Sequence, residues 1–321
     1  MINKAQLLMF CSLLLAGCSS DSPNDTQGTT NEISIKAQVW QVMQGAPRRA
    51  HTYDNAAALQ TEAHFTCTAY NAGTLTSYIS TTTVDWIAGA SRWGFNNGSD
   101  HYYWPASGNL DFFGYMPATL PSYIAADPAL TYTAEHNVTF TCSSLPMTNA
   151  GQGSSLQEFI YALTTGQNKT NAAAGVPLTF QHPFARIKLM LAASHPDITI
   201  NSITFKTIKN NGDYNHSASP KWSTSGDATN FVLSLTGDAA VFDNNPASER
   251  QIGDYYIMIP QDWAGEIVVN ANCLYWGEKK NYPSLTTTVP TNWQPGYSYT
   301  YTFNISPDDL KVDIEKFTEQ W

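Results

Sequence analysis

The sequence predicts an all-β protein built from two β-sandwich domains in tandem, and three observations support this fold class. Short runs of alternating apolar and polar residues recur along the chain and are separated by turn-forming clusters. Thr, Ser, Asn and Tyr are abundant while charged residues make up only 13% of the chain, which is typical of extracellular β-proteins. No amphipathic helix is convincing, and the best short helical candidates are Ala56–Glu62 and Leu156–Leu163.

The first element is an export signal. Lys4 precedes an apolar run from Leu7 to Leu15, which is too short to span a bilayer but suits a secretory signal. The run ends in Leu15-Ala16-Gly17-Cys18, which matches the lipobox of bacterial lipoproteins. We therefore expect residues 1–17 to be a signal peptide and Cys18 to carry lipid, palmitate included, in the outer membrane.

A tether, a strand and a basic site are expected next. Residues 19–31 are mostly small and polar without periodicity, which predicts a flexible tether. A strand follows whose apolar residues alternate with polar ones, namely Ile33, Ile35, Ala37 and Val39. It stops at Gly45-Ala46-Pro47-Arg48-Arg49, where a dibasic pair in an extended, exposed peptide favours proteolysis.

The centre of the chain predicts mainly strands, in two groups. The expected strands are 82–87, 109–115, 137–142, 178–180, 185–192, 198–208, 231–235, 255–259 and 266–276. The polar, Gly-bounded stretch 164–175 lies between the groups and predicts a domain boundary. We expect an N-terminal sandwich over 50–172 and a C-terminal sandwich over 173–321, with 18–49 as a removable propeptide.

The end of the chain predicts two further strands. Tyr297 to Ile305 alternates strictly, and Pro307-Asp308-Asp309 breaks the pattern. A second alternating strand follows, with Leu310, Val312 and Ile314 on its apolar face. Phe317 falls on the opposite parity, so we expect a bulge or bend near Lys316 within a possible donor strand over 310–317.

Three cysteines lie beyond Cys18, each on an apolar strand face: Cys67, Cys142 and Cys273. Buried structural thiols are the simplest interpretation. A Cys67–Cys142 disulfide is the alternative in an oxidising compartment, although an odd number of thiols argues against a complete disulfide framework.

No chemistry-bearing motif points to an enzyme, a metal site or a cofactor. The sequence has no GxSxG elbow, P-loop, HExxH or CxxC, and its acidic residues are scattered. His182 is expected to be a core or edge histidine, and Asp100-His101 a loop pair. With 16 basic against 26 acidic residues, nucleic-acid binding is not expected.

Several segments in this order resemble the fimbrillin family, the subunits of type V pili. They are the lipobox with its tether, strand and basic site, then Tyr102–Pro117, Glu158–Ala162, and Leu178–Leu189 with its Leu-x-Phe-x-His pattern. The resemblance implies transthyretin-like sandwiches and assembly by strand exchange with copies of itself or other pilus subunits. It also implies that an Arg-specific protease cuts after Arg49, with Arg48 as the alternative. The family often has Thr-Arg-Ala at the cut, whereas this chain has Arg48-Arg49-Ala50.

The residues themselves suggest how such assembly would work. Loss of residues 33–39 would uncover an apolar groove and unpaired backbone groups, which together form a template for another strand. The alternating tail at Leu310, Val312 and Ile314 fits that template. We therefore expect a surface-exposed lipoprotein precursor that becomes a shaft subunit of an adhesive fimbrium.

Two alternatives stay open. One is an anchor or tip subunit of the same pilus. The other is a lipid-anchored glycan-binding protein, in which a set of aromatic residues would stack on sugars, namely Trp86, Trp93, Tyr102, Tyr103 and Trp104.

Overall fold

The computed structural model describes residues 31–39, 55–62, 64–125, 128–132, 136–152, 156–192, 197–243, 249–275, 278–306 and 311–320. It is an all-β protein, as predicted, and Glu32–Trp321 forms one compact unit. Helix α1 (Ala56–Glu62) begins after Asn55, whose side-chain oxygen accepts from the Ala58 amide at 3.0 Å. The other short helical candidate, Leu156–Leu163, is wrong, because strand β8 (Ile160–Gln167) occupies its second half and pairs with β5.

The strands of the N-terminal half follow the predicted alternation closely. They are β1 (Ile35–Val39), β2 (His64–Asn71), β3 (Ser77–Ile87), β4 (Arg92–Phe95), β5 (Leu110–Met116), β6 (Ala129–Tyr132), β7 (His136–Cys142), β8 and β9 (Val176–Phe180). Short helical turns are η1 (Ala88–Ala90), η2 (Asn96–Gly98) and α2 (Asn149–Gln152).

The C-terminal half is likewise built from strands, joined by one 3-10 turn, η3 (Gly237–Ala240). The long strands are β10 (Ala185–Leu191), β11 (Ile198–Ile208), β14 (Thr229–Ser234), β19 (Glu266–Tyr275), β20 (Glu278–Thr288), β22 (Tyr297–Ser306) and β23 (Lys311–Gln320). The short strands are β12 (Asn211–Asn215), β13 (Trp222–Ser225), β15 (Val241–Phe242), β16 (Arg250–Gln251), β17 (Tyr256–Met258), β18 (Asp262–Trp263) and β21 (Thr291–Asn292).

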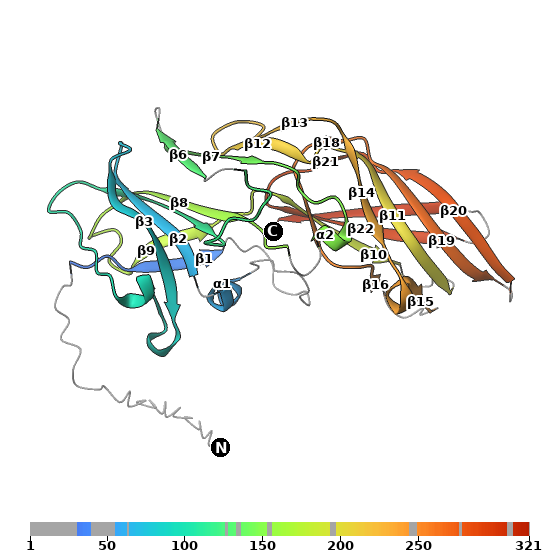
Figure 1. Cartoon of the computed structure of the whole chain (residues 1–321), viewed down its shortest axis with the longest axis horizontal. Helices are drawn as coiled ribbons and strands as arrows, with labels where there is room; N and C mark the ends of the chain where they lie inside the picture. The colour runs from blue at the N-terminus through green and yellow to red at the C-terminus, as the bar shows by residue number, and fades with distance from the viewer. Residues whose placement is uncertain are drawn as a thin grey trace, which may run out of the picture. The chain divides into compact units, whose positions relative to one another are not determined.

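The N-terminal half contains a seven-stranded sheet in the order β8-β5-β2-β3-β4-β1-β9. Its inner face buries an apolar cluster in which Phe65 contacts Trp93 and Phe180 edge to face, at ring-centroid distances of 5.0 and 5.2 Å. The two ends of the strand order also meet, through a bridge between Tyr161 and Gln181. Figure 1 shows β1, in blue, alongside β9.

A four-stranded sheet, β13-β12-β7-β6, joins the two halves of the chain. Strand β12 pairs with β7 so that Tyr214 lies opposite Phe140. A second apolar cluster contains both of these residues, together with Phe184 and Trp222. The boundary proposed near residue 172 stays a prediction, and the pairings of β9 and β12 with N-terminal strands cross it.

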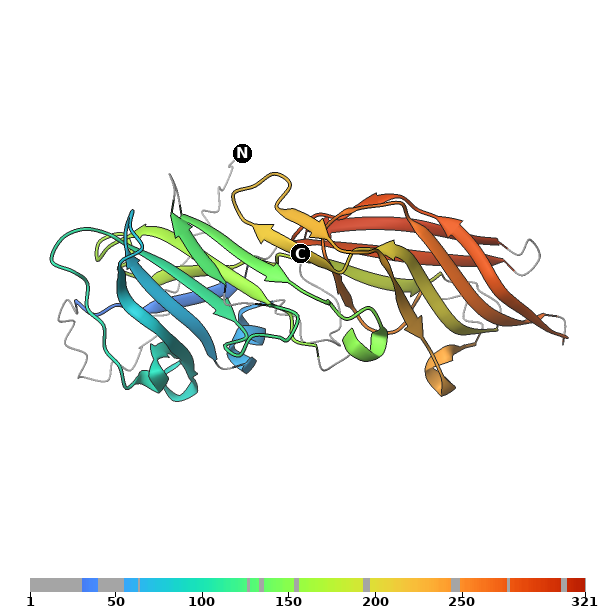
Figure 2. The same ribbon diagram turned by 45° about the horizontal axis from the view of Figure 1, so that its top comes forward.

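Most of the remaining strands form a sandwich of two sheets, visible in Figure 2, while β18 and β21 pair in a separate two-stranded sheet. One sheet has the order β16-β10-β22-β23 with β17 beside β10, and the other has the order β14-β11-β19-β20 with β15 beside β11. Between them lies the largest cluster, where Trp263 stacks on Trp293 and Phe205 at centroid distances of 4.9 and 5.1 Å.

The tail pairs with its own sheet. Strand β23 runs antiparallel to β22 from Tyr297↔Gln320 to Ser306↔Lys311. The bulge expected near Lys316 is wrong, because this register has no shift. Phe317 falls on the opposite face of the alternating pattern from Val312 and Ile314. Its side chain is 62% exposed to solvent, so the strand needs no bend to accommodate it.

The cysteines are structural, and no disulfide joins them. Cys67, Cys142 and Cys273 are all free and buried, so the alternative of a Cys67–Cys142 bridge is wrong. The reason is that Cys67 faces the cluster inside the seven-stranded sheet, whereas Cys142 belongs to the cluster beneath β7. Burial raises the pKa of Cys67 and Cys142 to about 12 and that of Cys273 to about 11, which keeps the thiols protonated.

Candidate functional site: the first strand and its surroundings

Strand β1 is an interior strand of the seven-stranded sheet. It runs parallel to β9 over its whole length, from Ile35↔Val176 to Val39↔Phe180, and it touches β4 at the antiparallel pair Ile35↔Trp93. Removal of β1 would therefore leave a gap between β4 and β9 inside the sheet, a slot that another strand could fill, rather than remove an edge strand. Such a slot has unpaired backbone groups on both walls.

The side chains of this segment divide as the sequence pattern predicts. Ile33, Ile35 and Val39 are 2%, 7% and 6% exposed and belong to the inner cluster. Ala37 is half-buried and packs against the same cluster. On the other face, the Gln38 amide donates to the Thr179 hydroxyl at 2.9 Å. The segment thus contributes three large aliphatic side chains to the core.

Polar contacts fasten the beginning of this segment to residues 101–103. The Ile33 amide donates to the Tyr102 carbonyl at 2.7 Å, and Glu32 forms an antiparallel bridge with Tyr103. The Glu32 carboxylate lies 2.7 Å from Nδ1 of His101. Sequence reasoning treated His101 as part of a loop pair and missed this contact, because its partner is distant in the chain and no local pattern marks it.

The walls of the slot have supports of their own. Gly175, at φ +98°, lets β1 approach closely, since a Cβ there would lie 3.3 Å from the Ser34 hydroxyl and 3.4 Å from the Lys36 Cβ. Strand β9 is also held from its other side, where the Thr164 hydroxyl donates to the Pro177 carbonyl at 2.5 Å. Strand β9 therefore keeps a partner that does not depend on β1.

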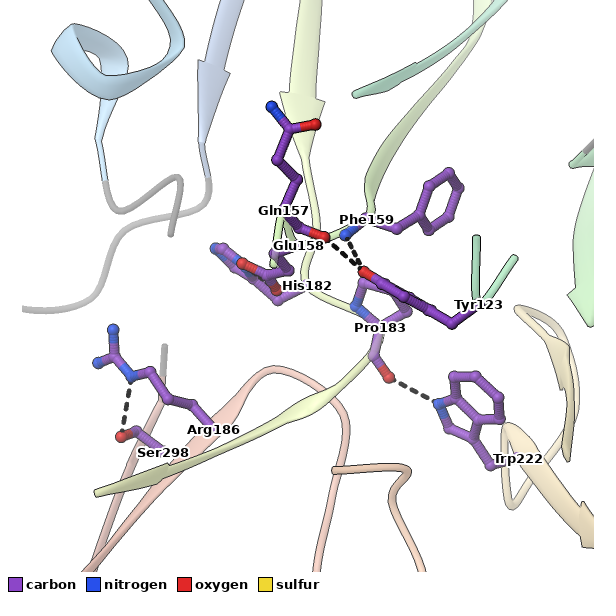
Figure 3. A network of polar contacts seen from close by, with 9 residues as sticks. All are labelled: Tyr123, Gln157, Glu158, Phe159, His182, Pro183, Arg186, Trp222 and Ser298. Atoms are coloured by element: carbon purple, nitrogen blue, oxygen red, sulfur yellow. Dashed lines mark hydrogen bonds and ion pairs between the residues drawn. The ribbon is translucent and has the colours of Figure 1, made fainter. Parts of the chain in front are cut away.

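Two segments that carry the family resemblance meet at a buried pair. Nδ1 of His182, just after β9, lies 2.8 Å from a carboxylate oxygen of Glu158, just before β8, and both side chains are at most 2% exposed. Figure 3 shows this pair beside Tyr123, which accepts from the Phe159 amide at 2.9 Å and donates to the Gln157 carbonyl at 2.8 Å. The expectation of a core histidine at 182 is confirmed by its burial.

The same stretch connects to the C-terminal half. The Trp222 indole donates to the Pro183 carbonyl at 2.6 Å, and Nε of Arg186 donates to the Ser298 hydroxyl at 3.1 Å (Figure 3). A shift at the end of β9 would therefore reach strands β10, β13 and β22.

A second polar cluster lies under the β12–β13 hairpin. The Tyr161 hydroxyl is 2.6 Å from both the Tyr214 hydroxyl and Nδ1 of His216, and the Lys221 ammonium is 3.4 Å from the same nitrogen. Burial, together with the charge of Lys221, lowers the pKa of His216 below its usual value. Burial also lowers the pKa of Lys221 and raises that of Tyr214 to about 12.

This cluster predicts an acid-sensitive contribution to stability. Because the pKa of His216 is lower in the folded than in the unfolded protein, the unfolded chain binds more protons below the ordinary value of 6.5. Stability is therefore expected to fall as the pH drops from 7 toward 5, and His216→Asn should flatten that decline. Urea unfolding at pH 7, 6 and 5 tests this. An identical slope for the variant and the wild type would contradict it.

The aromatic residues considered for sugar stacking are mostly core residues. Trp93 and Trp104 are each 5% exposed, and Trp86 and Tyr102 pack against the inner cluster. Only Tyr103, at 54% exposure, presents its ring to solvent in this set. The five residues therefore do not form a shared exposed platform.

Within the described residues, no group of three or more His, Cys, Asp or Glu side chains is arranged to hold a metal ion. None of the helices among those residues is long and apolar enough to cross a bilayer.

Several predicted site residues lie outside the described part of the chain. These are the lipidation residue Cys18, the cleavage candidates Arg48 and Arg49, and Leu310 of the tail. For Val312 and Ile314 the structure gives the backbone pairing with Ile305 and Phe303.

The fold and the interior position of the first strand define an all-β sandwich protein, and sequence comparison is more specific. Residues 49–321 match the family described as fimbrillin-like, and the chain belongs to that family of fimbrial proteins. A comparison with curated proteins finds no match.

Solved structures share the fold. A fimbrial protein from Bacteroides vulgatus is 14% identical with a TM-score of 0.64, and the match covers 90% of this chain and 99% of that one. Putative cell adhesion proteins from Bacteroides uniformis and Bacteroides ovatus have TM-scores of 0.52 and 0.51 at 13% and 17% identity. These matches cover 91% and 90% of this chain, and 99% and 97% of the other chains. At these identities the likeness establishes the fold alone.

Proposed function

We propose that this chain is a shaft subunit of an adhesive cell-surface fimbrium and that proteolytic removal of its first strand triggers assembly. The single observation that carries the proposal is the interior position of β1 between β4 and β9, with the buried side chains of Ile33, Ile35 and Val39. Family membership supports the fimbrial role.

The energetic argument starts from what removal would expose. Each large aliphatic side chain that leaves the core forfeits roughly 1.5–3 kcal/mol of burial. The main-chain partners on β4 and β9 are lost at the same time. A subunit stripped of this strand is therefore driven to accept a replacement strand with the same alternation.

The tail of another copy supplies such a strand. Leu310, Val312 and Ile314 repeat the period-two pattern of the first strand. Among the described strands, β23 pairs with β22 alone and lies at the end of its sheet. Exchange of this tail between copies gives head-to-tail contacts that extend into a filament.

Processing completes the proposal. Lipid on Cys18 would hold the precursor in the outer membrane, facing outward, until an Arg-specific protease cuts after Arg49 or Arg48. The released piece, Cys18–Arg49, would contain the lipid and the first strand. Mature subunits would then assemble with copies of themselves or with other pilus subunits.

The test is controlled cleavage of the purified precursor with a trypsin-like protease. We expect a new N-terminus at Ala50 and ladders of polymers that resist SDS. The double variant Arg48→Gln/Arg49→Gln should remain a monomer under the same conditions. Quantitative cleavage at Ala50 that left only monomer would overturn shaft assembly, and the subunit would then be better explained as an anchor or a tip.

The structure gives no reason to prefer the glycan-binding alternative. Its central residues, Trp93 and Trp104, are occupied in the core. Affinity electrophoresis on polysaccharides would decide the matter, and a mobility shift would reinstate that function.

A further inference from the structure

The start of the first strand has a polar contact, between Glu32 and His101, that also bears on how an incoming tail would be aligned. We propose that His101 sets the register of the donor strand by pairing with Asp309 of the next copy. In that register Leu310, Val312 and Ile314 take the places of Ile33, Ile35 and Ala37. This inference rests on the strand exchange proposed above.

The removable strand and the tail share one pattern at this point. Glu32-Ile33-Ser34-Ile35-Lys36-Ala37 and Asp309-Leu310-Lys311-Val312-Asp313-Ile314 both begin with an acidic residue and continue with an apolar residue at every second position. In the precursor, the Glu32 carboxylate lies 2.7 Å from Nδ1 of His101. Aligning the two patterns puts the Asp309 carboxylate where Glu32 stands.

A tail shifted by two residues toward the position of Val39 is disfavoured for two reasons. Leu310 would then replace Ile35, and Asp308 would enter the position of Ile33, which is 2% exposed. Burying a carboxylate among apolar side chains is strongly unfavourable. Pro307 would occupy the position of Glu32, where it has no amide to donate to the strand opposite.

Displacement in the other direction removes the carboxylate that contacts His101 and exposes an apolar side chain. Lys311 would then take the place of Glu32 beside His101, and Leu310 would lie at the exposed position of Asn31. The proposed register puts Lys316 in place of Val39, which is the last residue of β1 and is 6% exposed. There the long lysine stem can cover apolar surface while the ammonium extends past the strand end.

On the exposed face of the sheet, a cross-link to Thr179 can report the register of the tail while Asp309 stays unchanged. In the precursor, Gln38 and Thr179 are neighbours joined by a 2.9 Å hydrogen bond. The proposed register puts Glu315 beside Thr179. The two displaced registers put Asp313 or Phe317 there instead.

The experiment is a disulfide scan between two protease-treated proteins. One carries Thr179→Cys, and the other carries Glu315→Cys, Asp313→Cys or Phe317→Cys, so a cross-link can form only between copies. The native cysteines are buried with raised pKa values and stay unreactive. We expect the Glu315→Cys protein to cross-link at least several-fold more than either of the others, and a preference for Asp313→Cys or Phe317→Cys would overturn the register.

A charge exchange then tests His101 itself. His101→Glu in the accepting protein should lower the cross-link yield at position 315 several-fold, and Asp309→Lys in the donor should restore it. An unchanged yield with His101→Glu, in a variant whose circular dichroism matches the wild type, would overturn the role of His101. Failure of the unsubstituted protein to polymerise at all would instead overturn the proposed function.

Discussion

Truncation after Ser306 is expected to abolish polymer formation while leaving cleavage at Arg49 intact. The truncated chain keeps the slot that β1 vacates but has no strand to offer to the next copy. The core of the C-terminal sandwich should persist, because β22 retains its parallel partner β10 from Arg186↔Ser298 to Leu191↔Phe303. The measurement is SDS gel electrophoresis after protease treatment, alongside N-terminal sequencing to confirm the cut.

A point variant tests whether polymer formation needs the apolar face of the tail as well as its length. Val312→Asp keeps the tail length but puts a carboxylate where the accepting slot is apolar, so polymer yield should drop by at least tenfold. The matched control is Lys311→Gln, which changes the other face and should polymerise normally. Ladders of normal length from the Ser306 truncation would show that another segment is the donor.

Glu158→Ala is expected to destabilise the folded protein by about 1–3 kcal/mol, the usual cost of removing the hydrogen-bond partner of a buried polar group. His182 would lose the carboxylate that lies 2.8 Å from its Nδ1, while its own side chain stays 1% exposed. Because the pair joins the end of β9 to the start of β8, the loss should also loosen one wall of the first-strand slot.

Guanidinium unfolding of the precursor provides the measurement. The control Glu158→Gln keeps an oxygen acceptor of the same shape and should lose clearly less stability than Glu158→Ala. The double variant Glu158→Ala/His182→Leu should recover part of the loss, because it leaves no buried imidazole without that carboxylate. A change below about 1 kcal/mol for Glu158→Ala would contradict a structural role for this contact.

The local pattern was sufficient for much of the fold. Strand β11 has the bounds that its alternation predicts, 198–208, whereas β7 begins one residue before its prediction and β5 is shifted by one residue at both ends. Where short apolar runs were ambiguous the prediction erred, as at 156–163, since an apolar segment of that length fits a helix turn or a buried strand equally well. The family resemblance rested on segments that meet in space, as Glu158 and His182 do.

By itself the sequence determined the all-β class, the alternating faces of the first strand and of β22, and the membership in the fimbrillin-like family. Only the tertiary structure decided that β1 lies between β4 and β9, that β12 joins the sheet of β7, and that Glu32 contacts His101. The physical reason is that a period of two records which face of a strand is buried, a property of neighbouring residues. Strand pairing and charge contacts depend on residues far apart in the chain, and no local period encodes them.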